Sequence, residues 1–199
     1  MSPRPRADRT ARRAEITSAA SALFAERGVA NTAVSDIAKA AGIAQGTFYL
    51  YFDSKDAAIL AVVEQVAQGI IVSTSARVAA ASSAVDKLLA VGAVLSELGA
   101  RPEAAALVDQ MHRPENRVLH DRLAQDLTRR LVPLLEEVVE QGVAEGAFRV
   151  DDTRAAAWFV LAGLQSVELA GTALSEMPVA LAKATGFALR ALGYQGPRP

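Results

Sequence analysis

The sequence contains no cysteine, and this absence excludes whole classes of site. Disulfide bonds, thiolate metal ligands and thiol nucleophiles all need that residue. Histidine is scarce as well, because His112 and His120 are the only two, and their separation does not match the i, i+4 spacing of a helical metal-binding pair. The sequence therefore predicts no metal site, and nothing in it indicates a cofactor.

Uninterrupted apolar runs are short. The longest, AAAWFVLAGL at 155–164, is too short to cross a bilayer, and the basic start MSPRPRADRTARR is not followed by the apolar run of a signal peptide. These observations predict a cytoplasmic protein without a membrane partner. Aromatic residues make up only 5% of the chain against 51% hydrophobic residues, so the apolar content is mostly Ala, Val and Leu, which favours helix over sheet.

The pattern predicts an all-α protein of about nine helices, because apolar residues recur at helical spacing between Gly and Pro interruptions. The expected helices cover residues 9–27, 34–41, 45–52, 55 into the seventies, 85–98, 102–112, 116–141, 152–176 and 178–192. We expect three parts: a flexible basic arm (1–8), a set of three helices (9–54) and a larger helical domain (55–199).

The formal net charge of −1 is distributed unevenly along the chain. Residues 1–55 hold eight Lys or Arg and five Asp or Glu, whereas the remainder is net negative. This asymmetry indicates a polyanionic partner for the N-terminal region.

Two short helices joined by a tight turn are expected within residues 34–52. Thr32 is placed to cap the first of them, Gly42 ends it, and the second follows after a turn of three residues. Ser54, or Asp53 before it, is placed to cap the next and longer helix. This arrangement is the helix-turn-helix pattern of DNA-binding proteins.

Four of the ten aromatic residues stand between Phe48 and Phe52. On a helix these two phenylalanines share one face, so we expect them to anchor the second short helix in the core. The outer surface of that helix would then carry Gln45, Gly46, Thr47, Tyr49, Leu50 and Tyr51. DNA would cover such a surface, because a glutamine amide pairs with adenine, a glycine admits close backbone approach, and hydroxyl groups bond phosphate oxygens. An isolated aromatic cluster of this kind is more typical of plain core packing.

The stretch TAVSDIAKAAGIAQGTFYLYFDSKDAAI, residues 32–59, resembles the DNA-binding signature of the tetracycline-repressor-like (TetR) family of bacterial transcriptional regulators. The helix-turn-glycine spacing, the GTFYLYF core and the SK helix start carry the resemblance. It implies a homodimer, most often a repressor, whose recognition helices enter successive major grooves of a palindromic operator on double-stranded DNA. It also implies release from DNA when a small-molecule effector enters the larger helical domain.

The same resemblance assigns roles to individual side chains. Those expected to contact bases or phosphates are Gln45, Thr47, Tyr49, Tyr51, Lys55 and, from the preceding helix, Ser35. Ala44 and Ala33 depart from the family pattern, which often has Ser or Thr at these positions. The recognition helix therefore lacks a hydroxyl cap, and the cap of the preceding helix depends on Thr32. The arginines of the basic arm are expected to touch the minor groove or the backbone, although alone they would indicate a solvated tail.

The segment AAAWFVLAGLQSVELAGTAL, residues 155–174, is apolar nearly all round and rich in small residues. Such a helix must be covered on more than one side. A second copy of the chain would cover it, which predicts that residues 152–176 and 178–192 form a two-fold, four-helix dimer interface. The alternative is a helix at the centre of the monomer.

Candidates for a ligand pocket are polar or soft residues that interrupt apolar faces. They are Gln65, Gln68, Met111, His112, Trp158, Gln165 and Glu168, and each taken alone is more typical of a rim or an interface than of a pocket. An enzyme is disfavoured, because the sequence shows no Ser-His-acid set, no Gly-rich phosphate loop and no paired carboxylates. A helical protein–protein interaction module without DNA binding is the remaining alternative, with Tyr49 and Tyr51 meeting another protein.

Overall fold

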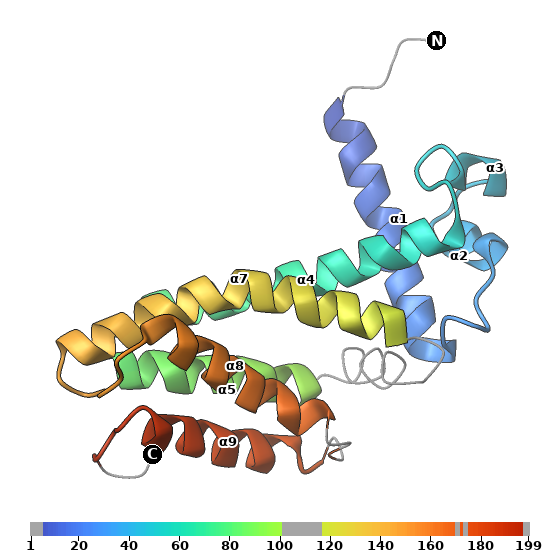
Figure 1. Cartoon of the computed structure of the whole chain (residues 1–199). Coiled ribbons are helices and arrows are strands. Elements are labelled where there is room, and N and C mark those ends of the chain that lie inside the picture. Colours follow the sequence, from blue (N-terminus) through green and yellow to red (C-terminus); the bar gives the residue numbers. More distant parts are fainter. Residues whose placement is uncertain (1–5, 101–116, 170–171, 173–174, 197–199) are drawn as a thin grey trace. The chain divides into compact units, whose positions relative to one another are not determined.

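The computed structural model describes residues 6–100, 117–169, 172 and 175–196. These ranges hold eight helices and no strand (Figure 1). The helices are α1 (Arg6–Arg27), α2 (Val34–Ala40), α3 (Gln45–Phe48), α4 (Lys55–Ala80), α5 (Ala84–Ala100), α7 (Arg117–Ala144), α8 (Thr153–Leu169) and α9 (Met177–Ala191). The predicted all-α class is confirmed, while the helix predicted at 102–112 lies outside the described residues.

The chain divides into two compact units, which are described separately. Unit 1 comprises Met1–Val66 and Ala106–Leu123, and unit 2 comprises Ala67–Ala105 and Ala124–Pro199. Among the described residues, unit 1 therefore holds α1, α2, α3, the beginning of α4 and the first residues of α7. Unit 2 holds the rest of α4 together with α5, most of α7, α8 and α9.

The core of unit 1 follows from helical periodicity. On α1, the residues Ile16, Ala20 and Phe24 are four apart and buried, so they form one continuous apolar face. Ile37 of α2 and Phe48 of α3 are buried as well, and α2 contacts both α1 and α3. The three helices therefore share one small core.

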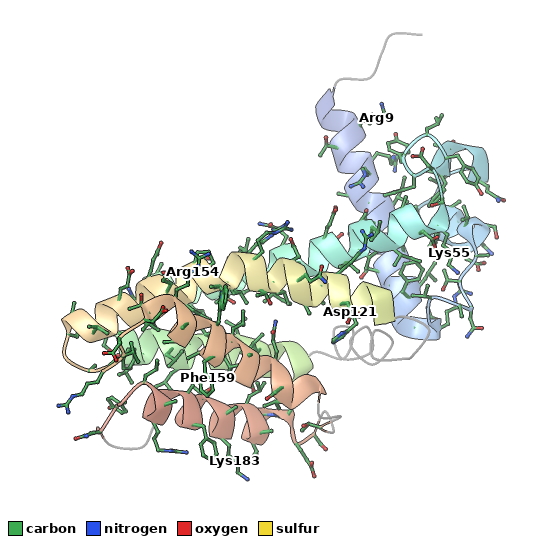
Figure 2. The ribbon with its side chains drawn as sticks, viewed as in Figure 1. Arg9, Lys55, Asp121, Arg154, Phe159 and Lys183 are labelled. Carbon is green, nitrogen blue, oxygen red and sulfur yellow. The ribbon has the colours of Figure 1, made fainter. Side chains whose placement is uncertain are left out.

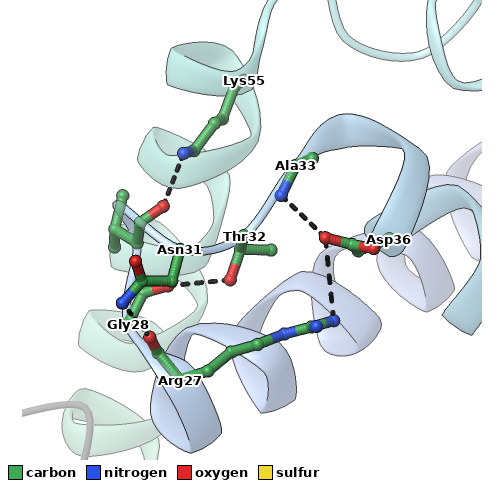
Figure 3. A network of polar contacts seen from close by, with 8 residues as sticks. Arg27, Gly28, Asn31, Thr32, Ala33, Asp36 and Lys55 are labelled. Atoms are coloured by element: carbon green, nitrogen blue, oxygen red, sulfur yellow. Dashed lines mark hydrogen bonds and ion pairs between the residues drawn. The ribbon is translucent and has the colours of Figure 1, made fainter.

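The start of α2 differs from the prediction. Thr32 does not cap it, because the buried Thr32 hydroxyl donates to the carbonyl of Gly28 at 2.8 Å. The N-cap residue is Ala33, and its N–H donates to the carboxylate of Asp36 at 3.0 Å (Figure 3). The same carboxylate lies 3.9 Å from the guanidinium of Arg27. The acceptor for the N–H of Ala33 is thus Asp36, a residue of the first turn of α2, and a carboxylate is favourable at the positive end of a helix.

The turn between α2 and α3 depends on Gly42. Its φ of 65° lies in the left-handed region that favours glycine. The N–H of Ile43 then donates to the carbonyl of Ala38 at 2.9 Å, which satisfies a carbonyl near the end of α2. Ala44 precedes α3 and makes no side-chain cap, as predicted.

The second short helix is shorter than predicted. Its α-helical part ends at Phe48 and does not reach Phe52. Beyond it, the N–H of Leu50 donates to Thr47 O at 3.1 Å and the N–H of Tyr51 donates to Phe48 O at 2.9 Å. Such i→i+3 bonds are typical of the last turn of a helix, so the chain continues past Phe48 in 3₁₀-type turns.

The beginning of α4 agrees with the prediction, because Ser54 Oγ accepts a hydrogen bond from the N–H of Ala57 at 3.1 Å. Within the described ranges, α4 is the one helix long and apolar enough to cross a membrane by length and composition, with a mean hydropathy of 1.6. The sequence argument considered only uninterrupted apolar runs and missed it. Ile59, Val62 and Ile70 are buried inside the protein, so core packing accounts for this apolar character.

In unit 2, α9 packs against α5 and α8 (Figure 1). Leu88 of α5, Leu164 of α8 and Leu189 of α9 are among the buried residues. The helices α5 and α9 approach closely at Gly92, where an added Cβ would stand only 2.4 Å from Thr185 Oγ1. A hydrogen atom at this position is therefore part of the packing of the two helices.

The end of α7 is bonded to the residues that connect α4 with α5. The carboxylate of Glu145 accepts the N–H of Ala84 at 3.0 Å and also the side-chain amide of Gln141. That amide donates to Ser82 O at 2.9 Å, and Lys87 donates to Gln141 Oε1 at 2.7 Å. The hydrogen bonds from Gln141 and Ala84 hold the pKa of Glu145 below its ordinary value.

Candidate DNA interface

Two buried rings anchor the element that follows the turn. Phe48 and Phe52 are 0% and 2% exposed, and their ring centroids lie 5.5 Å apart. The ring of Tyr49 meets that of Phe48 edge to face at the same centroid distance. The predicted core role of the two phenylalanines is confirmed, and it leaves the opposite side of the element free to face outward.

The outward side carries most of the side chains that the sequence assigned to DNA. Gln45 and Gly46 are exposed, Tyr49 is 49% exposed, and Thr47 and Tyr51 are half-buried. They come from one short element, so amide and hydroxyl groups stand within one contiguous stretch of surface. Ser35 is exposed on α2, the preceding helix.

Leu50 lies on this surface, as expected, although no DNA contact was assigned to it. It is 67% exposed, which is a high value for a large apolar side chain flanked by aromatic residues. An exposed aliphatic group can contact the C5-methyl group of thymine in the major groove. The signal was available in the sequence, since assigning Phe48 and Phe52 to the core places Leu50 between them on the other side of a helix.

Lys55, which the sequence assigned to a phosphate contact, makes a hydrogen bond within the protein. Its ammonium group donates a hydrogen bond to the carbonyl of Val29, in the loop between α1 and α2, and the side chain is half-buried (Figure 3). The bond fastens the first turn of α4 to that loop. An ammonium group has three donors, so contact with a phosphate remains chemically open to it.

The described glutamines among the predicted pocket residues each have a hydrogen-bond partner. In unit 1, Gln65 is exposed and donates to Ser18 Oγ at 3.4 Å. In unit 2, the half-buried Gln165 donates to Thr128 Oγ1 at 3.5 Å. A separate contact joins Gln68 to Arg130 at 2.8 Å. Met111 and His112 lie outside the described residues, as does the side chain of Glu168.

Trp158 belongs to an exposed apolar face of α8 and α9. The large residues of this face are Trp158 (56% exposed), Phe159 (63%), Val179 (59%) and Phe187 (67%). Cations flank them: the guanidinium of Arg154 lies 5.9 Å from the ring centroid of Trp158, and that of Arg190 lies 4.4 Å from that of Phe187. Figure 2 labels Arg154 and Phe159 on α8 and Lys183 on α9.

The α9 part of this face is an open groove of about 580 Å³. It is lined by Pro178, Val179, Ala182, Lys183, Gly186, Phe187 and Arg190. The opposite side of both helices is buried, and α8 is thus apolar on two sides, as predicted for the segment that begins at residue 155. An apolar face of this kind on a monomer marks an interaction site.

Residues 16–62 match the family described as bacterial regulatory proteins, tetR family. Among curated proteins, the transcriptional repressor KstR2 of Rhodococcus jostii is 47% identical over 62 residues, which is 30% of each chain. The matches to the first curated relatives cover between 26% and 32% of the length of those proteins. The likeness to these three relatives therefore covers about a third of each protein or less.

Solved structures extend the likeness in fold over most of the chain. RolR in complex with resorcinol has a TM-score of 0.67 at 22% identity, covering 96% of this chain and 92% of that one. The transcriptional regulator FadR from Bacillus subtilis, in complex with stearoyl-CoA, has a TM-score of 0.66 at 22% identity, covering 90% and 96%. The helix-turn-helix segment of this chain thus matches the tetR family of bacterial regulatory proteins, and the chain as a whole has the fold of solved regulators such as FadR.

Proposed function

We propose that this protein is a cytoplasmic, DNA-binding transcriptional regulator that binds a palindromic operator as a dimer. The observation that carries the proposal is the division of the element after the turn into two sides. Phe48 and Phe52 are sealed in the core, while Gln45, Tyr49 and Leu50 face solvent. This division presents amide, hydroxyl and aliphatic groups to base edges and phosphates from a firmly held backbone.

The dimer is the second part of the proposal. A two-fold partner would bury the exposed face of α8 and α9, whose large residues include Trp158 and Phe187. An isologous interface needs a self-complementary patch, and an open groove beside exposed aromatic side chains offers one. The same partner would supply the second recognition element that a palindrome requires.

The third part is control by a small molecule in the helical domain, with repression as the expected mode. Its support is the fold shared with RolR bound to resorcinol and FadR bound to stearoyl-CoA. Of the described candidate residues, Gln165 is the one we retain for the pocket, because it is half-buried and directed toward Thr128 of α7. We reassign Trp158 to the dimer face.

Selection of bound duplexes from random DNA by the purified protein tests the function and supplies the operator. We expect enrichment of a palindrome and an affinity that falls steeply with salt. Tyr49→Ala should weaken binding to the enriched duplex about tenfold or more without loss of helicity or self-association. Val72→Ala is the control, since Val72 is comparably exposed at 56% but lies on α4.

Unchanged affinity of a folded, correctly assembled Tyr49→Ala variant would contradict the assignment of the reading surface. Failure of the wild-type protein to enrich any sequence would favour the protein-interaction module instead. The effector is sought by thermal shift, because a ligand that binds only the folded state raises Tm. A true effector must also weaken DNA binding, and the duplex must weaken effector binding by the same factor.

A further inference from the structure

Two arginines of α1 contact the segment that follows α3. The guanidinium of Arg9 donates from Nη2 to the backbone carbonyl of Leu50 at 3.0 Å. The guanidinium of Arg13 lies 4.7 Å from the ring centroid of Phe52. Because the two arginines are four residues apart, they share one face of α1, and Figure 2 labels Arg9 on that helix.

The segment that they contact has little internal support. The α-helical part of α3 is four residues long, Ala44 gives it no side-chain cap, and neither of its end turns holds a charged residue. Beyond Phe48 the segment is closed by i→i+3 bonds from Leu50 and Tyr51 and by one i→i+4 bond from Phe52 to the Phe48 carbonyl, so the carbonyl of Leu50 stands at the negative end of a short helical run. A guanidinium group is a suitable donor for such a carbonyl.

The contacted atoms differ from those that face outward. Arg9 binds the main chain of Leu50, so its bond fixes the peptide plane and leaves the aliphatic side chain exposed. Arg13 covers a buried ring with its cation, which is a stabilising arrangement at a partly exposed site. Together the two arginines hold the segment that carries Tyr49, Leu50 and Tyr51 through contacts that leave the exposed side chains free.

We propose that Arg9 and Arg13 are positioning residues for the DNA-reading surface, acting through the Leu50 carbonyl and the Phe52 ring. The proposal rests on the proposed DNA-binding function. Arg9 and Arg13 therefore differ from the arginines of the basic arm (1–8), which are expected to contact the nucleic acid directly. Their contribution is the orientation of neighbouring side chains, and it therefore affects discrimination between sequences.

The test compares Arg9→Met and Arg13→Met with Arg12→Met. Arg12 lies on the same helix and is paired with Glu15 at 2.6 Å, so its substitution removes the same charge without touching the segment after α3. Each variant is titrated with the duplex enriched by the wild-type protein and with a shuffled duplex of equal length, over a series of salt concentrations. Far-UV circular dichroism verifies that each variant is folded.

Arg9→Met should lower affinity for the enriched duplex about fivefold or more relative to Arg12→Met, with affinity for the shuffled duplex equal in the two variants. The salt dependence of Arg9→Met should match that of Arg12→Met. An equal loss on both duplexes, with a salt slope reduced by about one relative to Arg12→Met, identifies a phosphate contact and overturns the proposal. Equal affinities of the two variants for the enriched duplex overturn it as well.

Amide hydrogen exchange of the DNA-free protein separates this proposal from the proposed function. Exchange at Leu50, Tyr51 and Phe52 should be faster in Arg9→Met than in Arg12→Met, because the hydrogen bond to the Leu50 carbonyl is lost. Equal protection in the two variants shows that Arg9 does not position the segment, whatever the protein binds. Faster exchange supports the positioning role even if the wild-type protein were found not to bind DNA.

Discussion

The ring of Phe48 lies 5.5 Å from that of Phe52, four residues further along the chain, and both are closed to solvent. Truncation of Phe48 to alanine leaves a cavity under the reading surface, and we expect it to cost about 3–5 kcal/mol of unfolding free energy. Denaturant unfolding measures this loss. Tyr49→Ala, half exposed on the same element, should cost far less. Similar losses for the two variants would show that Phe48 is not an anchor.

Gly42 and Gly46 offer a matched pair. An added Cβ would meet nothing within 4 Å at either position, but only Gly42 has a positive φ. Gly42→Ala should therefore destabilise by about 1–2 kcal/mol, which is the cost of the left-handed conformation for an L-residue. Gly46→Ala should be neutral or stabilise by up to about 1 kcal/mol, because glycine disfavours a helix. Equal effects in chemical denaturation would mean that the turn does not hold this conformation in solution.

Gly92→Ala tests the close approach of α5 and α9. The new Cβ would stand 2.4 Å from Thr185 Oγ1, so the helices must separate or the threonine must lose its bond to Leu181 O. We expect a loss of about 1–3 kcal/mol, as for other overpacked cores. Gly69→Ala on α4, where nothing lies within 4 Å, is the control and should not destabilise. The double variant Gly92→Ala, Thr185→Ala should lose less than the sum of the single losses in a double-mutant cycle.

Phe187→Glu should break self-association. The ring is 67% exposed on the α9 groove, so the substitution removes a large apolar contact from the proposed interface and puts there a carboxylate that is costly to desolvate. Sedimentation velocity should report a shift from dimer to monomer. Val72→Glu introduces the same charge at an exposed valine of α4 and should leave the assembly intact. A dimer that survives Phe187→Glu would move the interface to another surface.

The contribution of Glu145 to the stability of the folded protein should depend on pH. Hydrogen bonds from Gln141 and Ala84 lower its pKa in the folded protein, so the charged form is favoured by folding. The stabilisation is fully present above the ordinary glutamate value of about 4.5 and is lost as the pH falls through the lower folded value. The difference in Tm between wild type and Glu145→Gln should therefore be largest near neutral pH and should shrink in acid. A difference that does not vary with pH would contradict the assignment.

Periodicity and breakers were sufficient to predict the helical class, the helix-turn-helix and the buried pair Phe48 and Phe52, because these depend on spacing within one element. The cap of α2 was not predictable in the same way. The Thr32 hydroxyl could accept from the N–H groups at the start of α2 or donate to a carbonyl before it. In the folded protein it donates to the carbonyl of Gly28. The bond from Lys55 to Val29 was equally hidden, since it joins residues 26 positions apart.

The short length of α3 was missed for a related reason. A pattern of apolar residues four apart is compatible with both an α-helix and a tightened turn, and Phe48 and Phe52 satisfy either one. The contacts of Arg9 and Arg13 could not be read from sequence at all, because an arginine near a DNA-binding motif is expected to meet phosphate. In the structure, Arg9 donates to a main-chain carbonyl and Arg13 lies over an aromatic ring.

The bond between Lys55 and Val29 also has a mechanical meaning. Within the loop from Gly28 to Ala33, the Thr32 hydroxyl donates to the carbonyl of Gly28, and the ammonium of Lys55 joins Val29 to the first turn of α4. A rotation of that turn would pull on the loop and, through Ala33, on the leading end of α2. Lys55 thus links the first turn of α4 directly to the loop that leads into α2.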